Sequence, residues 1–144
     1  MTTQLEISKS FDSELTAWVE WKDGGFDVEL KYLSIGAAER LVRDCQIREW
    51  DPKSHQKVER MDEDKFKRKL SDLIVGWRGL TAKVASRLVN LKKDVPEDGE
   101  FPCTPSAKLF AISEFPNFPS FVLDSAKELH KMKEEGQREE EKNS

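Results

Sequence analysis

The two histidines, His55 and His130, are the first residues to consider for catalysis, because acyl transfer usually combines a nucleophile with a histidine base. His55 lies in a strongly charged stretch, and His130 falls on the polar side of an amphipathic segment. Neither belongs to a recognisable catalytic motif. Both are predicted to be ordinary surface imidazoles, and the chain is predicted not to be an enzyme.

Two acidic pairs, Asp62 with Asp64 and Glu97 with Asp98, could hold a hard cation or act as acid and base. The first pair precedes an apolar periodic segment, where negative charge complements the dipole of a helix. The second pair belongs to a Pro-Glu-Asp-Gly sequence, which is a turn signal. Capping and turn roles are therefore favoured, and no metal is predicted.

Glycine and cysteine spacing gives no cofactor site either. Gly24-Gly25 lacks the downstream Gly-Lys-Ser/Thr of a phosphate-binding loop, and Gly76-Trp77-Arg78-Gly79 has the wrong spacing. Cys45 and Cys103 lie far apart without a CxxC partner, so neither a zinc knuckle nor a disulfide framework is predicted.

The four tryptophans carry more information, since tryptophan serves both cores and binding hot spots. Trp18 and Trp21 are three residues apart, which puts them on opposite faces of a strand. Trp77 follows an apolar helical pattern and is predicted to join the core. Trp50 lies in a polar stretch, where it either contacts a partner or covers the edge of the core.

The N-terminal third of the chain predicts a hairpin and a helix. Residues 15–21 and 26–32 alternate apolar and charged side chains around Lys22-Asp23-Gly24-Gly25, which is typical of a β-hairpin. Ser34 is a helix cap, and the apolar spacing after it predicts a helix that ends near Ile47. The first dozen residues predict a short strand or a loose end.

The middle of the chain is predicted to be mostly helix and loop. Residues 48–60 are highly charged and contain Asp51-Pro52, so a loop is expected. A second helix should begin near Asp62 and continue to Trp77. Thr81–Leu91 fits a short helix, although its β-branched content would also allow a strand.

The C-terminal part predicts two helices and a tail. Thr104-Pro105 is a cap followed by proline at the first helical position, and Phe115-Pro116-Asn117 separates that helix from a last amphipathic helix that starts at Phe118. Residues 136–144 are charged and offer no apolar side chain for burial, so a disordered tail is expected.

These elements predict an α+β fold that is mostly helical, with an N-terminal antiparallel β-hairpin packed on a small helical bundle. Residues 1–135 should form one domain, a size that suits a single core. Partner contact is expected at residues of the charged middle stretch and of the last helix: Trp50, Phe118, Phe121, Leu129 and Met132. For the phenylalanines, burial where the helices turn onto each other is the favoured alternative.

Composition narrows the classes of function further. The net charge of −4, the pI near 5.4 and the scattered basic residues argue against nucleic-acid binding. The mean hydropathy of −0.70 and the lack of a long apolar run argue against a membrane span. We therefore expect a cytoplasmic protein.

Three motifs, taken in order, resemble the tail assembly chaperones of long-tailed phages and prophages. They are Gly76-Trp77-Arg78-Gly79-Leu80, Asp98-Gly99-Glu100-Phe101-Pro102-Cys103-Thr104-Pro105, and Phe115-Pro116-Asn117-Phe118 before a charged helix. The resemblance covers residues 26–135. Residues 80–96 depart from the family pattern, which is shorter there.

The resemblance implies a non-enzymatic protein without cofactors that binds the tape measure protein, with the tail tube subunit as a second candidate partner. It implies that such a chaperone keeps its clients soluble in the bacterial cytoplasm and is absent from the finished virion. Self-association is left open. The alternative is a structural minor tail or connector protein.

Overall fold

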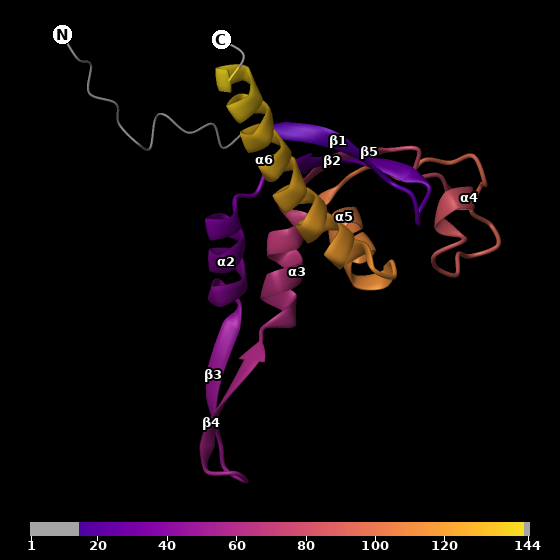
Figure 1. Ribbon diagram of the computed structural model, residues 1–144. Helices are drawn as coiled ribbons and strands as arrows, with labels where there is room; N and C mark the ends of the chain where they lie inside the picture. The colour runs from indigo at the N-terminus through magenta and orange to yellow at the C-terminus, as the bar shows by residue number, and fades with distance from the viewer. Residues whose placement is uncertain (1–14, 143–144) are drawn as a thin grey trace.

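The computed structural model describes residues 15–142, with side chains through residue 136; the predicted N-terminal strand or loose end lies outside this range. A three-stranded antiparallel sheet is covered by helices, and a two-stranded arm projects from the body (Figure 1). The fold is α+β, as predicted. Its elements are β1 (Thr16–Trp21), β2 (Phe26–Lys31), α2 (Ile35–Asp44), β3 (Gln46–Asp51), β4 (Gln56–Met61), α3 (Glu63–Ser71), β5 (Ile74–Arg78), α4 (Ala82–Ala85), α5 (Pro105–Glu114) and α6 (Phe118–Lys142).

The sheet has the strand order β1-β2-β5, and the predicted N-terminal hairpin is confirmed. Phe26, Val28 and Leu30 of the central strand point into the core, with exposed fractions of 3% or less. The charged residues between them face the other side, because side chains alternate along a strand. Trp21 is buried while Trp18 is exposed, which confirms that the two lie on opposite faces.

Helix starts follow the capping residues that the sequence offers. Ser34, Asp62, Thr81 and Thr104 each accept a hydrogen bond from a backbone N–H three residues later, at 3.1–3.2 Å. These bonds satisfy donors that the first turn of a helix leaves free. Local sequence therefore determines where α2, α3, α4 and α5 begin.

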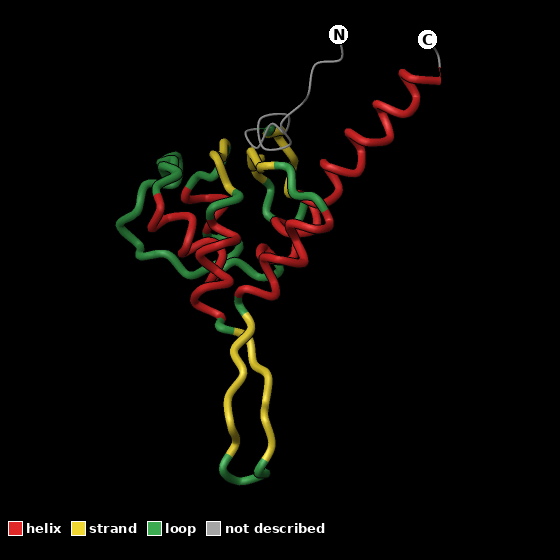
Figure 2. The backbone as a smooth tube through the Cα atoms, turned by 90° about the vertical axis from the view of Figure 1, so that its left-hand side faces the viewer, coloured by secondary structure: helices red, strands yellow, loops and turns green. Residues whose placement is uncertain are grey.

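The prediction of a loop over residues 48–60 was wrong, because this stretch forms the arm of β3 and β4. The arm extends from the end of α2 to the start of α3 (Figure 2). Both of its faces meet solvent along most of its length, so the strands lack the apolar alternation that marks a strand with one buried face. Pro52 lies in the turn at the tip and not within a strand.

The predicted second helix is shorter than expected, because α3 ends at Ser71 and Trp77 belongs to β5. Trp77 is half-buried against the core, and its Nε1–H donates to the carbonyl oxygen of Phe101 at 2.8 Å. The helix predicted over Thr81–Leu91 is limited to the single turn of α4.

The tail predicted to be disordered was also assigned wrongly, because α6 continues to Lys142. Glutamate, lysine, glutamine and arginine are good helix formers, so this segment can extend the helix. Figure 2 shows this end of α6 leaving the body of the molecule.

An aromatic cluster lies at the centre of the core. Phe118 is fully buried, and its ring centroid lies 4.8 Å from that of Trp21, 5.9 Å from those of Phe26 and Phe115, and 6.0 Å from that of Phe121. These rings come from the hairpin, α6 and the turn before α6. The cluster therefore joins the sheet to the C-terminal helices.

Candidate protein-binding surfaces

The titratable side chains of the described part of the chain form no cluster of metal ligands. No group of three or more His, Cys, Asp or Glu side chains could hold a metal ion within these residues. His55 lies at the tip of the arm, and His130 Nδ1 lies 3.6 Å from a carboxylate oxygen of Glu134 on the surface of α6. The exposed apolar side chains are more informative.

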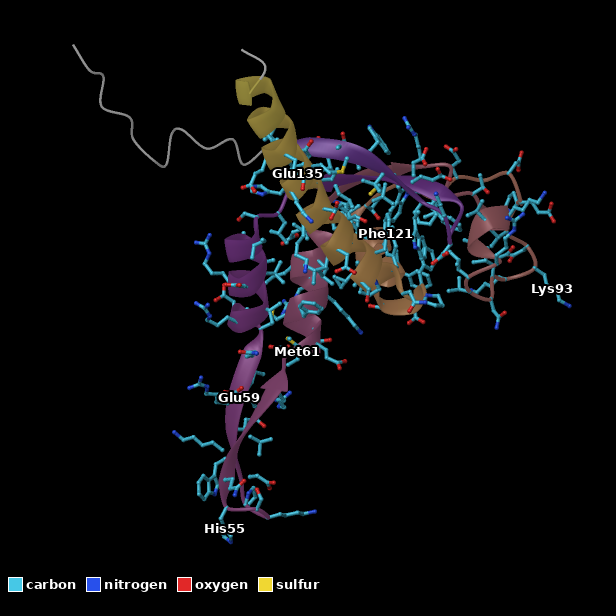
Figure 3. All side chains as sticks on the ribbon, viewed as in Figure 1. His55, Glu59, Met61, Lys93, Phe121 and Glu135 are labelled. Carbon is cyan, nitrogen blue, oxygen red and sulfur yellow. The ribbon has the colours of Figure 1, made fainter. Side chains whose placement is uncertain are left out.

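The arm presents Trp50 near its tip, with 60% of the side chain exposed. Its indole lies 6.3 Å from the ring of His55, which Figure 3 shows at the end of the arm. Val58 is 44% exposed and lies on the opposite face of the ribbon, because it pairs with Glu49 while Trp50 pairs with Lys57. Each face of the arm therefore carries an exposed apolar group.

Charged pairs across the two strands support this projecting geometry. Arg48 and Glu59 lie directly opposite each other, and the Nε atom of Arg48 lies 3.1 Å from a carboxylate oxygen of Glu59. The guanidinium of Arg60 contacts both carboxylate oxygens of Glu49, at 2.8 and 3.1 Å. Exposed pairs contribute little individually, and the bidentate geometry of the Arg60–Glu49 pair mainly helps to fix the register.

Asp51 organises the turn at the tip of the arm. One carboxylate oxygen accepts the backbone N–H of Lys53 at 2.9 Å, and the other accepts the hydroxyl of Ser54 at 2.9 Å. These two hydrogen bonds hold the pKa of the Asp51 carboxyl below its usual value. The turn ends at His55, whose φ of 54° lies in the left-handed region.

Acidification is expected to loosen the tip of the arm. Because the folded-state pKa of Asp51 is lowered, its stabilising effect is present above the unfolded pKa of about 4 and disappears as the pH falls through the folded value. Amide chemical shifts of Lys53 and Ser54 should report this transition in an NMR titration. An Asp51→Asn variant should lack it, and an unchanged transition in that variant would contradict the assignment.

The candidates on α6 fall into two groups. Phe118 is fully buried, so it cannot contact a partner while the core is intact. Phe121 is half-buried and stacks on Trp21 at 5.8 Å. Leu129 is half-buried, and Met132 is 58% exposed. Helical spacing alone could not separate these residues.

A groove between α2 and α6 was not anticipated from the sequence. It has a volume of about 820 Å³ and a lining that includes the apolar side chains of Ile35, Val42 and Leu123. Its rims carry both charge signs, with Glu39 and Arg43 on α2. Ile35 is 69% exposed, but an apolar first residue of a helix gives no sign of exposure in a sequence.

The arm and the groove characterise a small α+β protein whose described surface carries several exposed apolar side chains. None of the helices in residues 15–142 has the length and apolar character needed to cross a bilayer. Comparison with protein-family models, curated proteins and solved structures found no match to this chain.

Proposed function

We propose that this protein is a tail assembly chaperone that binds the tape measure protein during phage or prophage tail morphogenesis. The observation that supports the proposal most directly is the projection of the arm beyond the body, with a large exposed apolar residue near its tip (Figure 1). This residue is Trp50, and Met132 of α6 is a second exposed apolar residue. An exposed apolar group on a projecting element is suited to transient contact with an apolar client.

The mechanism follows from the distribution of charge and apolar surface. A client that would otherwise aggregate covers its own apolar surface by contacting the arm and α6. The charged residues of the chaperone, 36% of the chain, keep the complex in solution in the host cytoplasm. Because each contact is small and exposed, the growing tail tube can displace the chaperone. No catalytic residue or cofactor takes part.

Co-expression with the tape measure protein tests this proposal, and Trp50→Ala is the decisive variant. A hot-spot tryptophan contributes about 2 kcal/mol or more, so the complex should weaken about thirtyfold or more. Affinity purification followed by light scattering measures how much complex forms. The fold should tolerate the change, since Trp50 is 60% exposed and contributes nothing to the core.

Trp18→Ala is the matched control, because Trp18 is also an exposed tryptophan but lies on the outer face of β1. It should leave the amount of complex unchanged. A tape measure protein that precipitates alone while the wild-type chain elutes by itself would exclude the chaperone function.

The second candidate function is a structural minor tail or connector protein. The arm favours it, because within the described residues β3 and β4 pair only with each other and leave both outer edges open. An open edge can add a strand from a neighbouring subunit. Recovery of the chain from purified virions by mass spectrometry would favour this function, whereas a chaperone should be missing from them.

A further inference from the structure

The arm of β3 and β4 has an open edge along β4. Within the described residues β4 pairs only with β3, so its outer edge has no partner strand there. The pairing is regular from Gln46–Met61 at the base to Asp51–Gln56 at the tip, without the register shift that interrupts the pairing of β2 with β5. Bulges and prolines commonly keep a strand edge from pairing. β4 has neither, because Pro52 lies in the turn, so its edge is able to accept another strand.

The ladder shows which backbone groups point out from this edge. At the base of the arm, the backbone N–H of Asp62 donates to the carbonyl oxygen of Cys45 at 2.6 Å. Hydrogen-bonded and non-hydrogen-bonded pairs alternate along an antiparallel ladder, so the pairs that contain Lys57 and Glu59 are of the second kind. The N–H and C=O groups of Lys57 and Glu59 therefore point away from β3.

The side chains of this edge form a self-complementary pattern. Lys57 and Glu59 are exposed on one face of the ribbon, and Val58 between them is 44% exposed on the other. Figure 3 shows Met61, Glu59 and His55 in this order from the body to the tip, so the edge lies on the projecting part of the molecule. If a second Lys-Val-Glu strand runs in the opposite direction, each lysine meets a glutamate and valine meets valine.

We propose that two copies of this chain pair through the outer edges of β4, in an antiparallel register that places Val58 opposite Val58 of the second copy. Lys57 of each copy then lies opposite Glu59 of the other, and the outward N–H and C=O groups of these residues hydrogen-bond to each other. The two arms become one four-stranded sheet, with the two bodies at its opposite ends. A two-stranded ribbon without a buried face is marginally stable in water, so the added strands stabilise the arm.

Charge selects this register among the alternatives on β4. A symmetric pair of antiparallel strands places one residue opposite its own copy. An axis at Lys57, Glu59 or Arg60 puts like charges directly opposite each other, which is destabilising. An axis at Val58 avoids these pairs and brings residues 56–60 of the two copies together.

The outer edge of β3 is less suited to a second copy. An axis at Arg48 or Glu49 puts like charges opposite each other, and an axis at Trp50 does the same with its two acidic neighbours. An axis at Ile47 pairs only residues 46–48 of β3, next to the end of α2. The complementary edge is therefore that of β4.

The dimer would change how the arm meets a client. The twofold axis is perpendicular to the four-stranded sheet, so Trp50 of both copies lies on one face. A client bound by one tryptophan meets the second at a high effective concentration, which raises the affinity without a new kind of contact. Only this consequence rests on the proposed function, since pairing of the arms needs no client.

Two charge-reversal variants test the edge and its register. Lys57→Glu puts glutamates opposite each other in both symmetric pairs, and Glu59→Lys does the same with lysines. Each variant alone should dimerise about tenfold more weakly than the wild type in sedimentation equilibrium. An equimolar mixture of the two should form a heterodimer about as strong as the wild-type dimer, because every opposed pair is then glutamate with lysine.

Lys22→Glu is the matched control, because it makes the same charge change at an exposed residue of the other hairpin. It should leave self-association unchanged. Nuclear Overhauser effects between β3 and β4 check that each variant keeps its arm, since Glu59→Lys removes the contact with Arg48.

Four results would overturn the proposal. They are a wild-type mass that stays at 16.6 kDa up to about 1 mM protein, equal self-association of the wild type and Lys57→Glu, mixed variants that do not associate, and a mass that keeps rising beyond the dimer. The last result would indicate head-to-tail pairing of β3 with β4. A monomer that still binds the tape measure protein would reject the dimer and keep the chaperone function, so the two failures are distinguishable.

Discussion

Replacement of Phe118 by alanine is expected to lower the free energy of unfolding by about 3–5 kcal/mol. The side chain is fully buried, and its ring contacts aromatic rings from the hairpin and from both sides of the turn between α5 and α6. Truncation would leave a cavity that the surrounding rings cannot fill, because each is held by other elements. Urea denaturation followed by tryptophan fluorescence measures the loss.

Phe110→Ala is the matched control for this prediction. The chemical change is the same, but Phe110 is 52% exposed and contacts the aromatic cluster only through Phe115, at 6.3 Å. Its truncation should cost about 1 kcal/mol or less. If both variants lost equal stability, the aromatic cluster would not be the centre of the core.

Predictions from the sequence succeeded where one face of an element is buried and the other is exposed. β2 alternates buried and half-exposed side chains, so apolar period-2 spacing reveals both the strand and its inner face. The capping residues succeeded for a different reason. A serine, threonine or aspartate that accepts a nearby backbone N–H acts locally, without regard to the rest of the fold.

The arm could not be predicted because no core acts on it. Its residues alternate between two solvent-facing sides, so selection for burial leaves no pattern, and the dense charge resembles that of a loop. The strand β5, which contains Trp77, was missed because its apolar residues also fit a helix. Leu70, Leu73, Ile74 and Trp77 fit helical spacing, and only pairing with β2 turns the last two of them into a strand.

The candidate sites show the same limit. The sequence left Trp50 open between partner contact and the edge of the core, and only the structure shows that it is 60% exposed. Phe118 and Met132 carry the same kind of apolar signal, yet one is fully buried and the other is 58% exposed. The groove between α2 and α6 depends on residues that are separated by up to 96 positions, from Ile35 to Lys131. Contacts over such distances depend on how the chain packs, which periodicity does not report.

Replacement of Gly24 by alanine is expected to destabilise the protein by about 3 kcal/mol, a large effect for one added methyl group. A Cβ atom at Gly24 would overlap the indole ring of Trp21. The ring cannot move aside, because Trp21 is 3% exposed and lies against Phe26, Phe118 and Phe121. The backbone cannot move either, since the N–H groups of Gly24 and Gly25 both donate to the carbonyl oxygen of Trp21, at 3.2 and 2.8 Å.

Alanine variants of two other glycines serve as controls, because alanine there changes backbone strain or helix propensity without a steric overlap. Gly25 has open space around it but a φ of 78°. Gly25→Ala should therefore lower the free energy of unfolding only by about 1–2 kcal/mol, which is the cost of a left-handed backbone for a residue with a Cβ atom. Gly36 lies in α2 with nothing within 4 Å, so Gly36→Ala should stabilise the protein by up to about 1 kcal/mol. Thermal denaturation of the three variants should therefore rank Gly24→Ala lowest and Gly36→Ala highest. A Gly24→Ala variant as stable as Gly25→Ala would show that Trp21 is free to leave the turn, and that the aromatic cluster does not fix the hairpin against α6.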